Sequence, residues 1–153
     1  MRSMALKEDP INKFIQMIQN LKTFTNVDTD PISKEFKILV QDIYDVFTGL
    51  EQYSRKRRLA ILKLAHLYPN SLTTVELRKI MEYSDRTSLS YVRNELKDLE
   101  EDGIISIKRY KDKKLPFQIR INHQHRLMRV LISLTQFGIE YKEMVEEMVE
   151  KNE

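Results

Sequence analysis

The spacing of apolar residues changes at Gly103, and this change constrains the fold more than any other feature of the chain. From Leu89 to Leu99 apolar residues recur every three or four positions, as they do on one side of an α-helix. After Gly103 the segments 104–108 and 117–121 alternate apolar and polar residues, which is typical of half-buried β-strands. Glycine readily adopts the left-handed conformation that ends a helix. The sequence therefore predicts a helix that ends at Gly103 and a two-stranded hairpin after it.

Two more helices are predicted before this one. The first begins near Ser54 and stops before Pro69. The second begins at a capping box, in which the Thr73 hydroxyl accepts a backbone N–H and Glu76 reaches back to the N-cap. It extends to about Met81. The third helix, which ends at Gly103, is expected to be capped by Ser84 or Asp85. The residues expected to point inward from the second helix are Val75, Leu77 and Ile80.

The order helix, short helix, helix and hairpin within residues 54–121 resembles the winged helix-turn-helix. The passage Leu89-x-x-Val92-x-x-x-Leu96-x-x-Leu99-Glu100-x-x-Gly103-Ile104-Ile105 is similar to the one that joins the recognition helix to the wing in the MarR, ArsR and PadR regulators. This resemblance implies a mostly α-helical, DNA-binding fold with a small two-stranded β wing. The chain departs from MarR proteins in having Asp112-Lys113-Lys114 where their wing commonly has Asp-x-Arg. It also lacks the cysteine metal site of the ArsR sensors.

The third helix has a polar side that suits base recognition independently of the resemblance. With about 100° between residues, Thr87, Ser90 and Asn94 lie about 140–180° from the apolar stripe. Tyr91 and Lys97 lie about 120° from it, and the two arginines lie on its flanks. The acidic residues of the helix gather at the C-terminal end instead, away from where phosphates would lie. An ordinary amphipathic helix is the alternative interpretation. The expected base-reading residues, in a helix spanning about 85–102, are Arg86, Thr87, Ser90, Tyr91, Arg93, Asn94 and Lys97.

The hairpin is strongly basic, since residues 104–120 contain six Lys and Arg and one acid. In a winged helix the segment 106–120 would lie along the DNA backbone or the minor groove, where cations supply affinity with little sequence information. A solvated turn is the alternative. The residues expected to contact phosphates are Lys108, Arg109, Lys111, Lys113 and Lys114.

The chain's charge is unevenly distributed. Residues 54–121 contain 16 Lys and Arg against 9 Asp and Glu, whereas the rest of the chain contains 10 against 14. A basic centre between acidic flanks indicates that a polyanion binds the centre. The run Arg55-Lys56-Arg57-Arg58 could either reach flanking phosphates or lie against the acidic ends of neighbouring helices, and the sequence does not choose between them.

Helices on both sides of this centre suggest a dimer. Asp-Pro pairs at Asp9 and Asp30 open two N-terminal helices, ending near Leu21 and Tyr53, and Asn122 is expected to cap a last helix that reaches about Glu150. The second and last of these helices carry heptad repeats. We therefore expect three parts, with residues 1–53 and 123–153 packing or dimerising around a DNA-binding domain at 54–122. Both helices could instead fold back on a monomer. The expected dimer interface comprises Leu39, Val46, Leu127, Val130, Leu134, Phe137, Tyr141 and Met144.

Composition narrows the classes of function. The absence of cysteine excludes disulfides, thiolate metal sites and a cysteine nucleophile, and three isolated glycines leave no phosphate-binding loop. His123 and His125 are expected to be solvated, not metal ligands, and no residues resemble a catalytic set. We expect no cofactor and no membrane association. The start of the sequence lacks the apolar stretch of a signal peptide, which favours a cytoplasmic protein.

The sequence thus predicts a homodimeric, sequence-specific regulator of transcription that binds double-stranded DNA, not an enzyme. A pocket for a small-molecule effector would suit such a dimer, but the sequence locates none. The alternative from another class is a winged helix that binds an acidic protein partner in a transcription, replication or DNA-partition assembly.

Overall fold

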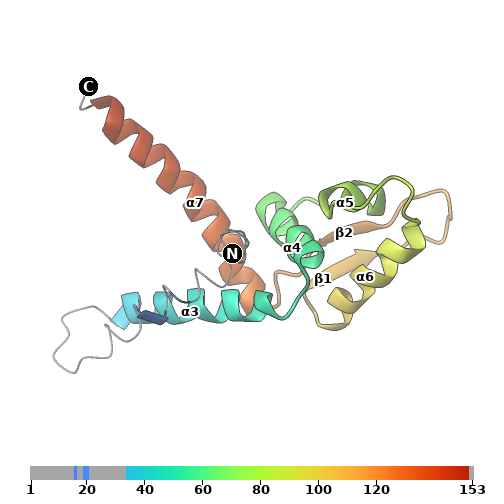
Figure 1. The fold of residues 1–153 in the computed structure, drawn as a ribbon, viewed down its shortest axis with the longest axis horizontal. Helices are drawn as coiled ribbons and strands as arrows, with labels where there is room; N and C mark the ends of the chain where they lie inside the picture. The colour runs from blue at the N-terminus through green and yellow to red at the C-terminus, as the bar shows by residue number, and fades with distance from the viewer. Residues whose placement is uncertain (1–15, 17–18, 21–33, 152–153) are drawn as a thin grey trace, which may run out of the picture. The chain divides into compact units, whose positions relative to one another are not determined.

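The computed structural model describes residues 16, 19–20 and 34–151, which divide into one unit up to Ser54 and a second from Arg55 onward (Figure 1). In the first unit, α3 spans Lys34–Glu51 and buries Val40, Val46 and Leu50. The expected start of this helix at Asp30 and almost all of the helix expected before it lie outside the described residues.

The second unit has the element order of a winged helix-turn-helix with one further helix. Its core contains side chains from the first three helices and both strands, each 2% exposed or less: Ala60, Ile61, Leu64, Leu77, Val92, Leu96, Leu99, Ile105, Ile119 and Ile121. Burying a Val, Leu or Ile side chain stabilises the folded state by about 1.5–3 kcal/mol. The elements are α4 (Arg55–Leu67), α5 (Thr74–Ile80), α6 (Leu89–Glu101), β1 (Ile105–Lys108), β2 (Gln118–Ile121) and α7 (Arg126–Lys151).

The predicted capping box opens α5, since Thr73 Oγ1 accepts the N–H of Glu76 and the Glu76 carboxylate accepts the N–H of Thr73. Leu77 is buried as expected, but the prediction for Val75 was wrong, because its side chain is 50% exposed. The helix is only seven residues long, so its inward side is narrow, and Thr74 occupies the buried position next to the cap.

The two helices α5 and α6 end in the same way but with different residues. In each, the N–H groups of two consecutive residues after the helix return to carbonyls of its last turn, and the first of these two residues has a positive φ. At α6 this residue is Gly103, as predicted (φ 76°). At α5 it is Glu82 (φ 64°), which has a Cβ and therefore a less favourable backbone.

The start of α6 differs from the prediction. Ser88, not Ser84 or Asp85, is the N-cap, and its hydroxyl accepts the N–H of Tyr91. Ser84 begins a turn instead, in which its carbonyl accepts the N–H of Thr87. Four residues that were predicted to be helical therefore form the connection from α5 to α6.

The sheet has one more strand-like segment than expected. β1 and β2 pair antiparallel, with Ile105 opposite Ile121 and Lys108 opposite Gln118. On the other edge of β2, Leu72 exchanges two backbone hydrogen bonds of 2.8 Å with Ile119. β2 is therefore central, between β1 and the residues that precede α5.

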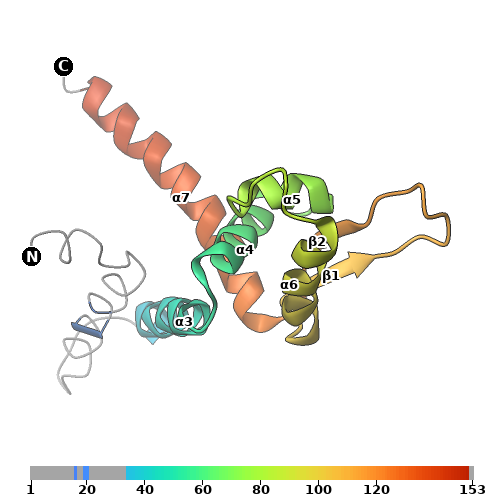
Figure 2. The same cartoon turned by 45° about the vertical axis from the view of Figure 1, so that its right-hand side comes forward.

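The last helix begins later than predicted. Asn122 does not cap it but forms a turn that ends at His125, and its side chain donates to the carbonyl of Gly103 at 2.9 Å. The first part of α7 packs against α4 and buries Met128 and Leu131. In both ribbon views no other element of this unit lies beside the second half of α7 (Figures 1 and 2).

Candidate nucleic-acid interface

The outward side of α6 is formed by Ser90, Asn94 and Lys97, all of them exposed. They lie about 120–180° around the helix from the buried stripe that contains Val92 and Leu96. Their side chains offer a hydroxyl, an amide and an ammonium group, which are the donors and acceptors that read base edges in a major groove. Asn94 and Ser90 are thus placed where the sequence predicted.

One flank of α6 adjoins α4 and the connection that follows α5. Tyr91 is 51% exposed and meets the ring of Tyr83 edge-on, with 5.7 Å between the ring centroids. The Lys56 ammonium lies 4.3 Å from the centroid of the Tyr83 ring. Burial raises the pKa of the Tyr83 hydroxyl, and the nearby Glu95 carboxylate raises it further. The position of Tyr91 is therefore fixed by a ring on the preceding connection.

The other flank adjoins the wing. Arg93 places its guanidinium 4.8 Å from the centroid of the Phe117 ring, and Arg109 places its own 5.6 Å from the same centroid. Arg109 also forms two hydrogen bonds of 2.8 Å with the Glu100 carboxylate. Sequence reasoning assigned Phe117 only to a strand. The sequence did contain a signal for the contact of Phe117 with two arginines, because this aromatic residue begins the predicted second strand next to a basic connection.

Two of the predicted base readers precede the helix. Arg86 is exposed in the turn before α6. Thr87 is half-buried, and its carbonyl accepts a hydrogen bond of 3.2 Å from the Arg78 guanidinium. The later start of α6 therefore separates these two residues from the outward side formed by Ser90, Asn94 and Lys97.

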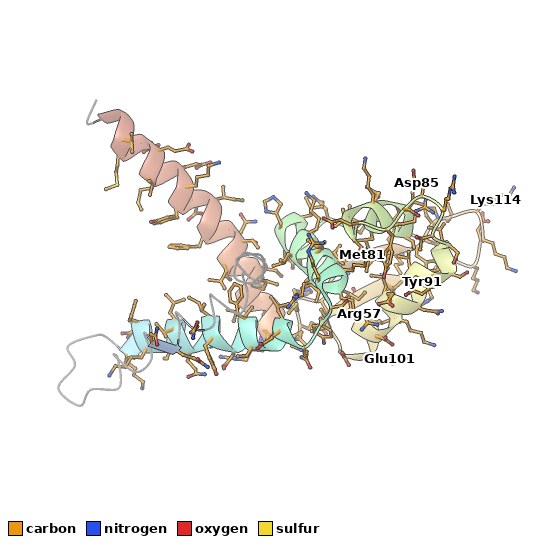
Figure 3. The ribbon with its side chains drawn as sticks, viewed as in Figure 1. Arg57, Met81, Asp85, Tyr91, Glu101 and Lys114 are labelled. Atoms are coloured by element: carbon orange, nitrogen blue, oxygen red, sulfur yellow. The ribbon has the colours of Figure 1, made fainter. Side chains whose placement is uncertain are left out.

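The wing tip is the connection between β1 and β2, which extends away from the helices of this unit (Figure 2). It is organised by Asp112, whose carboxylate accepts the N–H of Lys114. Lys111, Lys113 and Lys114 are exposed, and Figure 3 shows Lys114 at the outer end of the connection. Among the described residues, these three lysines have no carboxylate partner.

The basic run at the start of α4 lies against acidic residues of its own unit, which was the second of its two interpretations. Arg55 forms an ion pair with Glu82, and Lys56 donates to the carbonyls of Met81 and Glu82. These contacts bind the end of α5, where Glu82 has its positive φ.

Arg57 continues this pattern on α6. Its guanidinium lies 2.8 Å from a Glu95 oxygen and 2.6 Å from an Asp98 oxygen. Three carboxylates of α6 are thus paired with cations, Glu95 and Asp98 with Arg57 of α4 and Glu100 with Arg109 of the wing. These contacts neutralise charge beside the outward side of the helix.

The residues expected at a dimer interface divide into two groups. Leu127, Val130 and Leu134 in the first half of α7 are half-buried, whereas Phe137, Tyr141 and Met144 are 61%, 54% and 52% exposed. Phe137 and Tyr141 stack, with 6.1 Å between their ring centroids. On α3, Leu39 is 47% exposed, but Val46 is only 1% exposed and has no surface left for a partner.

Two further properties concern the described part of the chain only. No three His, Asp or Glu side chains there gather closely enough to hold a metal ion. None of its helices combines the length and the apolar character needed to cross a bilayer.

Comparison with solved structures finds distant similarity to winged-helix regulators. The haem-bound haem sensor PefR from Streptococcus agalactiae is 14% identical, with a TM-score of 0.44 over 95% of this chain and 94% of that one. FabT from Streptococcus pneumoniae, solved with DNA, is 15% identical, with a TM-score of 0.39 over 92% and 80%. The homodimeric winged helix-turn-helix fragment of Mb0332 from Mycobacterium bovis is 18% identical, with a TM-score of 0.40 over 74% and 94%.

No protein family and no curated protein matches this sequence. The fold assignment therefore rests on the order and contacts of this chain's own elements.

Proposed function

We propose that this chain is a dimeric, sequence-specific double-stranded DNA-binding regulator of transcription. The observation that carries this proposal is the outward side of α6, where Ser90, Asn94 and Lys97 are exposed while Glu95 and Glu100 are paired with cations on the flanks. A helix with such a surface fits the major groove, which accepts an α-helix and presents distinct hydrogen-bonding groups for each base pair.

The remaining predicted residues have supporting roles in this proposal. Tyr91 and Arg93 lie on the two flanks of α6 and would contact the edges of the groove, and Arg86 and Thr87 precede the helix where it would approach the backbone. The wing lysines would bind phosphates, which gives affinity for any duplex. Arg109 contributes less to this term, because it is already paired with Glu100. Lys108 would bind phosphate together with the wing lysines.

The proposed base reader is tested most directly by Asn94→Ala. Duplexes that bind the wild-type protein are first selected from a randomised pool, and affinities are then measured by fluorescence anisotropy on a selected and a scrambled duplex. An amide that forms hydrogen bonds with adenine contributes about 1–3 kcal/mol of discrimination. We therefore expect the variant's affinity for the selected duplex to fall about 5–150-fold and its affinity for the scrambled duplex to change little. The matched control is Gln124→Ala, which removes an exposed amide outside α6.

Equal weakening of Asn94→Ala on both duplexes would show that this side chain does not read bases. Failure to bind any duplex at low salt would instead favour the interpretation that the winged helix binds an acidic protein partner.

The exposed apolar side of α7 supports a dimer. Phe137, Tyr141 and Met144 continue a heptad pattern over the half of the helix that has no other element of its unit beside it. The 26 residues of α7 give a helix of about 39 Å, long enough for two copies to pack along it. A twofold dimer would then present two α6 helices to half-sites about 34 Å apart.

Sedimentation tests this assembly with a single added charge. Wild type should sediment at twice the chain mass of 18.3 kDa. Phe137→Glu should sediment as a monomer with its helical content intact, because it places a carboxylate within an apolar interface. Gln136→Glu, an exposed neighbour outside the heptad pattern, should remain dimeric. A monomeric wild type would remove the dimer from the proposal.

A further inference from the structure

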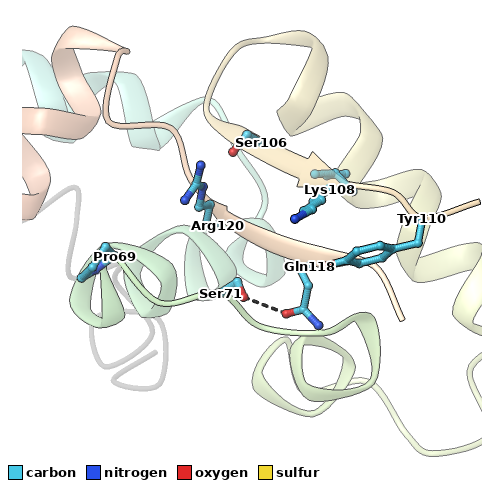
Figure 4. Close-up of a pocket in the computed structure, with 8 residues that line it drawn as sticks. Pro69, Ser71, Ser106, Lys108, Tyr110, Gln118 and Arg120 are labelled. Carbon is cyan, nitrogen blue, oxygen red and sulfur yellow. Dashed lines mark hydrogen bonds between the residues drawn. The ribbon is translucent and has the colours of Figure 1, made fainter. Parts of the chain in front are cut away.

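The outer side of the sheet carries a groove, and Lys108 is the one residue of its lining that the DNA-binding proposal uses. Its volume is about 530 Å³, within the range of small-molecule sites (Figure 4). It lies between the segment before α5 and the solvent side of β1 and β2. The residues that matter for its chemistry are Ser71, Ser106, Lys108, Tyr110, Gln118 and Arg120.

The strand register brings two cations together in this groove. Ser106 lies opposite Arg120 and Lys108 opposite Gln118, so Lys108 and Arg120 are diagonal neighbours on one side of the sheet. No acidic residue lines the groove, and among the described residues neither cation has a carboxylate partner. This differs from Arg109, the residue after Lys108, whose charge is neutralised by Glu100.

The polar groups of the groove are mainly hydrogen-bond donors. Ser71 Oγ donates to the Gln118 side-chain oxygen over 2.7 Å, which occupies that acceptor and leaves the Gln118 amide hydrogens for another group. The Ser106 hydroxyl lies on the same side of the sheet, and the Lys108 ammonium lies 5.2 Å from the Tyr110 ring centroid. An ammonium, a guanidinium, an amide and a hydroxyl thus line one groove that contains no acidic side chain.

We propose that this groove binds the phosphate group of a ligand. A phosphate has several strong acceptor oxygens, and it matches the fork of an arginine together with the point charge of a lysine. The opposite side of the sheet, with Ile105, Ile119 and Ile121, is buried beneath the helices. The groove is therefore on the other side of the sheet from α6. The phosphate belongs either to a small phosphorylated molecule or to a nucleic-acid backbone.

The test is a titration of the full chain with inorganic phosphate at constant ionic strength, followed by the backbone amide signals in NMR spectra. Saturable shifts should centre on Ser71, Ser106 and Gln118. The variant Lys108→Gln with Arg120→Gln should bind phosphate at least about tenfold more weakly, because two charge-assisted hydrogen bonds are lost. This titration requires no DNA binding, so it succeeds or fails separately from the proposed regulator function.

The matched control is Lys63→Gln with Lys79→Gln, which removes the same charge from exposed helical positions outside the groove. It should bind phosphate within about twofold of wild type, because neither lysine lines the groove. Arg120→Lys keeps the charge but not the fork of the guanidinium and should have little effect on folding. Its affinity for phosphate should lie between those of wild type and of the Lys108→Gln, Arg120→Gln variant. Shifts that do not saturate, or equal weakening in the control, would overturn the proposal.

A second arm identifies the source of the phosphate. If a bound duplex prevents the phosphate shifts, the groove takes a backbone phosphate of nucleic acid. If duplex and phosphate bind together, the ligand is a small phosphorylated molecule. Either result requires the same phosphate site.

Discussion

The cations of the winged unit are paired with carboxylates on its helical side but not at the tip of its wing. On the helical side, Arg55 and Arg57 lie against Glu82, Glu95 and Asp98, and these ion pairs connect α4 to the end of α5 and to α6. At the wing tip, Lys111, Lys113 and Lys114 are exposed and have no carboxylate partner among the described residues. Side chains of the same charge thus connect elements of the fold in one region and remain available to a polyanion in the other.

The difference teaches that net charge alone does not locate a nucleic-acid surface. Residues 54–121 have more basic than acidic residues, yet Arg57 is bound between two carboxylates of its own chain. Such a residue contributes to stability and adds little to the field that a duplex would meet. Most of the excess charge lies in residues 104–120, which contain six basic residues and one acid. The predictions below separate the two regions.

The largest effect is expected when Lys111, Lys113 and Lys114 are all changed to Gln. Because each lysine would displace counterions from a phosphate, affinity at low salt should fall about 10–100-fold on specific and random duplexes alike, and the slope against log salt should decrease by about 2–3. Fluorescence anisotropy over a salt series measures both. The free energy of unfolding should stay unchanged, since these side chains form no ion pair with any carboxylate of the described residues.

The control for this variant removes the same charge elsewhere, by changing Lys34, Lys63 and Lys142 to Gln, all exposed on other helices. It should keep the salt slope of wild type. If the wing variant kept that slope too, the wing would not contact phosphate, and the contrast between the two regions would disappear.

A smaller effect, on stability and not on binding, is expected from Arg57→Met. The side chains of Arg57 and Glu95 are 24% and 22% exposed, so the variant leaves the Glu95 carboxylate without its cation in a partly desolvated position. The second partner, Asp98, is 57% exposed and loses less. We expect the free energy of unfolding to fall by about 1–2 kcal/mol, measured by urea denaturation at neutral pH. Lys63→Met, on the exposed side of the same helix, should change it by about 0.5 kcal/mol or less.

A variant as stable as wild type would show that Arg57 does not hold α4 to α6. A variant that instead lost DNA affinity in the folded state would place Arg57 at the interface, and the distinction between the two regions would have to be redrawn.

The winged part of the fold could be predicted because its signals are local. The capping box at Thr73, the apolar stripe of α6 and the glycine at its end each depend on residues close in sequence, and the structure contains all three. The start of α6 was placed too early because Ser84, Asp85 and Ser88 are all acceptable caps. Only the turn that connects Ser84 to Thr87 selects Ser88.

The contacts that could not be predicted join residues far apart in sequence. Leu72 pairs with Ile119, and Arg57 reaches Glu95, with no motif to connect them. The groove on the sheet also depends on residues that are far apart in sequence. Alternation placed Lys108 and Arg120 on strands, but their diagonal approach depends on the register, which fixes Ser106 opposite Arg120. The local patterns therefore do not determine which residues of distant segments lie opposite each other.

The smallest effect is expected at Arg109, a wing cation that is paired with a carboxylate, as Arg55 and Arg57 are on the helical side. The hydrogen bonds from Arg109 lower the pKa of the Glu100 carboxyl below its ordinary value of 4.5. A lowered pKa stabilises the fold above the ordinary value, and this contribution is lost as the pH falls through the lowered pKa. Because Arg109 is 49% exposed and screened by solvent, the contribution should be about 0.5 kcal/mol or less.

Urea denaturation of wild type and Arg109→Gln over a pH series measures this contribution. The two should differ at neutral pH and converge in acid, where Glu100 is protonated in both. Glu100→Gln should behave like Arg109→Gln, and the double variant should lose no more than either alone, because both remove the same pair. A difference that persisted in acid would show that Arg109 acts through its contact with Phe117, 5.6 Å from the ring centroid, and not through Glu100. Arg109 would then be a wing residue that packs, unlike the paired cations of α4.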